Sequence, residues 1–176
     1  MVYDEIMRSL KWSTSNAAFV PEIDDEHKEI FEQVSAIQRA LAGGAASPRI
    51  QALSQRLLTE MVNHFAHEER LMRAARYSAM RWHKRQHDNA RKRAGQFTAR
   101  INDGDNEAGS ELVAYISSWL RDHTRLADRM LGAALRNHSL CKVVFRAGTK
   151  PADACSWFDT TGEKFNPARQ PEASRQ

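Results

Sequence analysis

Apolar residues recur at helical spacing over most of this chain. Between residues 20 and 136 they return every three or four positions in four stretches, which is the pattern of helices with one buried face. No stretch in this region alternates strongly enough to predict a β-strand. The four predicted helices run from about Asp24 to Leu41, from Ser47 past Leu71, from Ser78 to Ile101, and from about Ala108 to Arg136.

Short turn-forming segments separate these stretches. Gly43 and Gly44 follow the first, and the cluster at 102–106 follows the third. We expect Ser47 and Ser78 to act as N-caps. Four helices of similar length with short connections predict an all-α, antiparallel up-down-up-down bundle.

The two ends of the chain lack the helical pattern. Residues 1–20 show no sustained period and are expected to form an N-terminal arm on a bundle domain of residues 21–136. Residues 137–176 form a C-terminal extension, either flexible or packed on the bundle, in which 143–145 resemble a short β-strand.

Each predicted helix carries histidine on the face that should be apolar. Burying histidine or glutamate costs free energy unless the side chain is hydrogen-bonded, paired with a charge or bound to a metal. Residues four positions apart lie one turn apart on one helical face, so they can bind a metal from the same side. The candidates are His27, then His64 with Glu68, then His83 with His87, and finally His123.

Asp128 completes the set, but its spacing is unusual. It follows His123 by five positions, which on a regular helix turns it about 140° away. Two nearby ions, or a local bulge in the helix, would reconcile the two positions. Five imidazoles and two carboxylates are too many ligands for a single zinc ion, which takes four. They suit a pair of iron, manganese or zinc ions that share the two carboxylates.

At this point the chain resembles a known family, the bacterial haemerythrin-like proteins. The resemblance covers about residues 12–131 and rests on segments 23–28, 64–72, 83–87 and 119–128 together with Phe31 and Tyr77. It implies a non-haem di-iron centre with a bridging oxygen. His83, His87 and His123 would hold one iron, His27 and His64 the other, and Glu68 and Asp128 would bridge them.

The resemblance also implies a function. The second iron would keep one position open for dioxygen, so the protein would bind oxygen reversibly as a carrier, a store or a local supply. Leu120 and Thr124 would lie beside the oxygen. Thr124 stands where the family usually has an apolar residue, and its hydroxyl could admit water or supply a proton. Glu26 replaces a common glutamine. The alternatives are an oxygen or redox sensor that signals through the tail, and a di-iron enzyme that reduces peroxide or nitric oxide.

Composition and charge bear on where the protein is located and what it binds. Hydrophobic residues make up 41% and charged residues 27%, with a net charge of +4 and two cysteines. No apolar run reaches the ~18–20 residues of a membrane span, and no signal peptide is evident, so we expect a cytoplasmic protein. Residues 78–101 are basic but lack interleaved aromatic residues, which argues against nucleic acid. The extension, with Cys141, Cys155 and Trp157, is a candidate surface for a protein partner.

Overall fold

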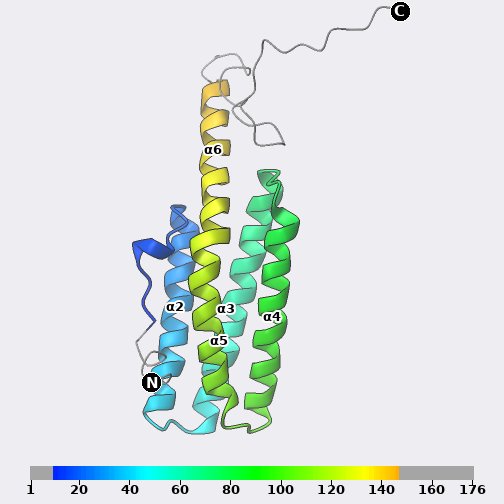
Figure 1. Ribbon diagram of the computed structural model, residues 1–176. Helices are drawn as coiled ribbons and strands as arrows, with labels where there is room; N and C mark the ends of the chain where they lie inside the picture. Colours follow the sequence, from blue (N-terminus) through cyan, green and yellow to red (C-terminus); the bar gives the residue numbers. More distant parts are fainter. Residues whose placement is uncertain (1–9, 147–176) are drawn as a thin grey trace, which may run out of the picture. The chain divides into compact units, whose positions relative to one another are not determined.

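Four long helical rods pack side by side with alternating direction (Figure 1). The computed structural model describes residues 10–146, with side chains to residue 138. Within these residues there is no β-strand. The fold predicted from the sequence, an all-α four-helix bundle, is confirmed. Its helices are α2 (Pro21–Ala42), α3 (Ser47–Ala74), α4 (Met80–Asn102) and a fourth rod made of α5 (Ala108–His123), the turn η2 (Thr124–Asp128) and α6 (Arg129–Arg146).

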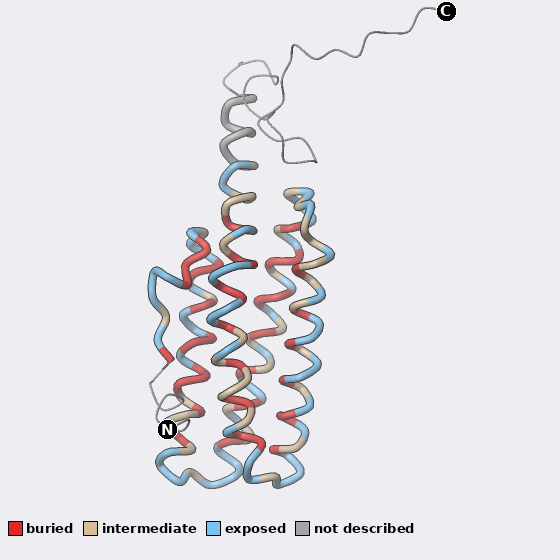
Figure 2. Tube along the Cα trace, in the orientation of Figure 1, coloured by how far each residue is buried: buried red, intermediate tan, exposed pale blue. Residues whose placement is uncertain are grey.

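The buried core follows the apolar spacing of the sequence. Each helix packs on its neighbours around the bundle, α2 on α3, α3 on α4, α4 on α5, and α5 on α2. Figure 2 shows the buried positions recurring along the inner faces of the rods. Burying each large apolar side chain contributes about 1.5–3 kcal/mol. The largest contributors include Phe31, Ile37, Leu57, Met61, Phe65, Leu112, Ile116 and Leu120.

The helix ends differ from the predicted caps. Ser47 is the first helical residue of α3, and Ala46 occupies the N-cap position without a side-chain hydrogen bond. Ser78 likewise lies outside the cap of α4, which is Ala79. At the start of α5 a side chain does pair with free backbone N–H groups, because the Asp105 carboxylate accepts hydrogen bonds from those of Glu107 and Ala108.

The N-terminal segment, residues 10–20, lies against the bundle. Leu10 is buried in the core, and the Ser35 hydroxyl donates a hydrogen bond of 2.6 Å to its carbonyl. A short 3-10 helix, η1 (Thr14–Asn16), follows and contacts η2. Asp24 then accepts a 2.7 Å hydrogen bond from the backbone N–H of Ala18.

The fourth rod is longer than predicted. Helix α6 continues to Arg146, so residues 143–145 are helical, and the β-like interpretation of that run is wrong. The chain divides into two units between Arg136 and Asn137. Cys155, Trp157 and residues 1–9 lie outside the described residues, so the expectations for them are not tested. None of the described helices combines the length and apolar character that a membrane crossing requires.

Candidate metal centre

Seven polar side chains converge inside the bundle, drawn from all four rods. All are buried among the apolar residues of the core. They form two overlapping groups of potential metal ligands, and in each group one nitrogen or oxygen atom per residue lies within 4.8 Å of the others. Glu68 and Asp128 belong to both groups. The first group adds His83, His87 and His123, and the second adds His27 and His64.

Each carboxylate divides its two oxygens between the groups. Glu68 Oε2 lies 3.3 Å from His83 Nε2 and 3.1 Å from His87 Nε2, whereas its Oε1 faces His64 Nε2 at 3.9 Å. The side chain thus lies between three imidazoles contributed by two helices.

Asp128 has the same relation to the other side of the cluster. Its Oδ1 lies 3.1 Å from both His83 Nε2 and His123 Nε2, and its Oδ2 lies 3.1 Å from His27 Nε2. Each of the two carboxylates therefore presents one oxygen to each group of histidines.

A π-helical turn explains how His123 and Asp128 reach the same centre. The residues from Thr124 to Asp128 form this turn, and the backbone stays helical on both sides of it. Because a π-turn joins residues five positions apart, it places both side chains on one face. Of the two explanations left open by the sequence, the local bulge is the one that the structure contains.

The donor atoms of the cluster fit metal ions. Although His27 Nε2 and His87 Nε2 each lie 3.1 Å from a carboxylate oxygen, neither atom forms a hydrogen bond of acceptable geometry within the described residues, and the same holds for both oxygens of Glu68 and of Asp128, all of which are buried. Buried polar atoms without partners are costly, and a cation would satisfy them together. Imidazole with carboxylate is the donor set of iron, manganese and zinc.

Electrostatics keep both carboxylates ionised. Burial and the nearby Asp128 would each raise the pKa of Glu68, but the histidines around it outweigh them and lower it. Burial likewise opposes ionisation of Asp128, and His123 lowers its pKa well below the usual value. Against the effect of burial, these carboxylates raise the pKa of His83 to about 9. Without a cation, a proton on His83 places positive charge beside both carboxylates.

The Glu26 carboxylate, outside the cluster, holds His64 in position. His64 Nδ1 donates a 2.8 Å hydrogen bond to Glu26 Oε2, and His67 Nδ1 donates one of 2.7 Å to Glu26 Oε1. A proton on Nδ1 leaves the Nε2 lone pair of His64 directed into the cluster, which is the tautomer that binds metal. His67 itself lies outside the ligand groups. The sequence showed Glu26 only as a departure from a family pattern, not as this partner.

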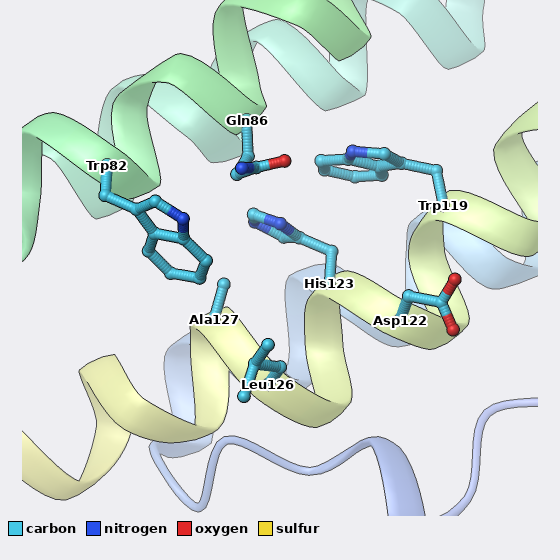
Figure 3. A pocket seen from close by; sticks show the side chains of 7 residues that line it. All are labelled: Trp82, Gln86, Trp119, Asp122, His123, Leu126 and Ala127. Atoms are coloured by element: carbon cyan, nitrogen blue, oxygen red, sulfur yellow. The ribbon is translucent and has the colours of Figure 1, made fainter.

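Aromatic rings brace two other histidines. Phe65 stacks on His87 with ring centroids 4.2 Å apart, and Trp119 stacks on His123 at the same distance. Beside this stack a pocket of about 360 Å³ opens between α4 and the fourth rod. In Figure 3 the His123 ring lies between Trp82 and Trp119. Nothing in the spacing of the sequence predicted this pocket.

The two residues predicted to flank an oxygen site are both buried. Leu120 packs in the main core, one turn before His123. The Thr124 hydroxyl donates a 2.8 Å hydrogen bond to the Leu120 carbonyl and accepts one of 2.8 Å from Asn16 Nδ2. Its proton is therefore engaged with the backbone of its own helix. Neither residue lines the pocket of Figure 3.

Fold and site together define a class of protein, a four-helix bundle that encloses a histidine–carboxylate cluster suited to a pair of metal ions. The family model of the "Hemerythrin HHE cation binding domain" matches residues 18–135, and the chain belongs to this family.

Known relatives agree with this assignment. The chain is 31% identical over 159 residues to a bacteriohemerythrin of Pseudomonas paraeruginosa, covering 90% of this chain and 99% of the relative. It is 31% identical over 117 residues to a hemerythrin of Sipunculus nudus, covering 66% of this chain and 86% of that protein. A crystal structure of a leucine-to-phenylalanine mutant has the same fold, with a TM-score of 0.64, 25% identity and coverage of 71% of this chain and 95% of that one.

Proposed function

We propose that the protein holds two iron ions in this cluster and binds dioxygen reversibly. The observation that carries the proposal is the division of each carboxylate's oxygens between a group of three histidines and a group of two. In this assignment His83, His87 and His123 bind one ion, His27 and His64 bind the other, and Glu68 and Asp128 bridge them.

The unequal number of histidines supports a binding function. With two shared carboxylates, the ion held by His27 and His64 has one protein ligand fewer than its neighbour. A pair of ferrous ions with one open position supplies reversible dioxygen binding, which is the chemistry of the haemerythrin family. The protein contributes the unequal ligand set.

The surroundings of the cluster keep water away. Phe65, which stacks on His87, and Leu120, one turn before His123, are almost fully buried, and the ligands themselves have little or no exposed surface. The Thr124 hydroxyl, which could have delivered a proton, donates to the Leu120 carbonyl instead. A buried site whose nearby Thr124 hydroxyl is not free to donate a proton favours holding oxygen over reducing it.

A spectroscopic cycle tests this function. The iron-loaded protein is reduced under argon, exposed to air and returned to argon while its absorption spectrum and iron content are recorded. We expect about two irons per chain and a spectrum that forms in air and disappears under argon over repeated cycles. Iron near one per chain would refute the two-ion centre. Oxygen that is consumed without returning would show an enzyme.

A further inference from the structure

We propose that the N-terminal segment is part of the scaffold of the metal centre. In this proposal Asn16 is a positioning residue that keeps η2 in its π-helical form, so that Asp128 faces His123. The inference rests on the proposed function only in treating the cluster as a metal site, since oxygen plays no part in it.

The π-turn needs support from outside its own helix. Such turns are rare because the wider backbone ring packs less well than an α-helical turn. If η2 relaxed to an α-helix, Asp128 would rotate about 140° from His123 on the helix surface. The 3.1 Å approach of Asp128 Oδ1 to His123 Nε2 would then be lost.

A buried chain of hydrogen bonds supports the turn at its first residue. Asn16 is only 3% exposed and Thr124 is fully buried. The Asn16 amide donates to the Thr124 hydroxyl, which donates to the Leu120 carbonyl, each at 2.8 Å. A threonine that bonds the carbonyl four residues earlier distorts a helix at that point. Asn16 fixes the direction of the Thr124 hydroxyl and therefore favours this bond.

The same segment also holds the residue that follows the turn. Arg129 comes directly after Asp128, and its guanidinium donates hydrogen bonds to the carbonyls of Thr14, Ser15 and Ala17 at 3.1–3.3 Å. The N-terminal segment therefore binds both ends of η2. A segment attached at both ends of the turn opposes a change in the turn's length and rotation.

A glycine in α6 permits this close approach. A Cβ atom built on Gly132 would lie 1.9 Å from the backbone oxygen of Ala18, which is well inside contact distance. Any larger residue here displaces the segment without changing a ligand or the turn itself. Gly95 offers the matched comparison, because a Cβ on this α4 residue meets nothing within 4 Å.

Two variants release the segment in different ways. Asn16→Ala removes the amide donor, and Gly132→Ala pushes the segment away from α6. Their controls are Asn102→Ala, at an exposed position at the end of α4, and Gly95→Ala. Amide hydrogen exchange of the metal-free proteins reports directly on η2. We expect faster exchange across residues 124–129 in both test variants and no change in the controls.

Cobalt(II) titration measures the consequence for metal binding, because its absorption reports the number and geometry of nitrogen and oxygen ligands. We expect both test variants to bind cobalt about 10–100-fold more weakly than wild type, the range seen when partners of metal ligands are removed. The titration is repeated with Asn16→Ala in an Asp128→Ala background. If Asn16 acts through Asp128, the second loss is much smaller than the first.

The outcomes separate this proposal from its alternatives. Unchanged exchange in η2, or wild-type cobalt affinity in both test variants, would overturn it. An equal loss of affinity in the presence and absence of Asp128 would show general destabilisation and would also overturn it. If wild type binds no cobalt, the metal centre is wrong, and the exchange data still decide whether the segment holds the turn. If Asn16→Ala fails to fold, Gly132→Ala decides.

Discussion

Shortening Leu120 to alanine should both destabilise the bundle and expose the metal centre to water. Leu120 is 2% exposed, and Leu112, two turns earlier on α5, is 1% exposed. Leucine-to-alanine changes at such sites cost about 2.7–5 kcal/mol. At ~3 °C per kcal/mol for a domain of this size, each variant should melt about 8–15 °C below wild type. Leu112→Ala is therefore a control of matched chemistry and burial.

The two cavities differ in what surrounds them. A cavity holds water only where two or more polar groups line it. Leu120 lies one turn from His123. Leu112 lies eight residues before Leu120, about 12 Å farther from His123 at a rise of ~1.5 Å per residue, among the apolar side chains of the core. We therefore expect a wet cavity beside the centre in Leu120→Ala and a dry one in Leu112→Ala.

Autoxidation of the oxygen-loaded protein distinguishes them. A trapped water that hydrogen-bonds the departing oxygen more strongly in the transition state than in the oxygenated state lowers the barrier to its loss by about 1 kcal/mol or more. Leu120→Ala should therefore lose its oxygenated spectrum about fivefold faster than wild type, or more, and Leu112→Ala should keep the wild-type rate despite its lower melting temperature. Equal rates in the two variants would show that Leu120 does not guard the site, and that any change reflects stability alone.

Three further variants or conditions test the site. Glu68→Ala removes a ligand shared by both groups and should abolish the two-ion spectrum, whereas a retained spectrum would exclude Glu68 as a bridge. Glu26→Ala frees the His64 ring and should weaken metal binding about 10–100-fold in a cobalt titration, and unchanged affinity would show that the hydrogen bond is not needed. Because the pKa of His83 is raised to about 9 in the folded protein, the stability it adds is present below its ordinary pKa, near 6.5, and is lost as the pH rises through about 9. Thermal melts of metal-free protein should show this loss between these two values, and His83→Gln should remove that part of the pH dependence.

The sequence predicted the bundle and the residues of the cluster because both depend on local spacing. Helical periodicity decides which positions share a face, so histidine and glutamate on apolar faces identify residues that must meet inside the bundle. His64 and Glu68, for example, are one turn apart whatever the rest of the chain does. That these residues bind iron is still a prediction.

Other features depend on partners distant in the sequence, and spacing does not reveal them. The π-turn is such a case, since its first residue Thr124 bonds Asn16 from the far end of the domain. The hydrogen bond from His64 to Glu26 joins two helices and needs a known packing register. The end of α6 was also missed, because residues 143–145 favour β-structure locally but continue an existing helix.

The π-turn gives the fourth rod an unusual tolerance of length. A turn closed between residues five positions apart holds one residue more than an α-helical turn. Deleting the exposed Arg125 would leave His123 and Asp128 four positions apart, the separation of His64 and Glu68, with the remainder of α6 in register. The same deletion in the middle of α3 would rotate every later residue by about 100° and turn polar side chains into the core. A one-residue deletion should therefore cost less stability at η2 than within the uninterrupted helices.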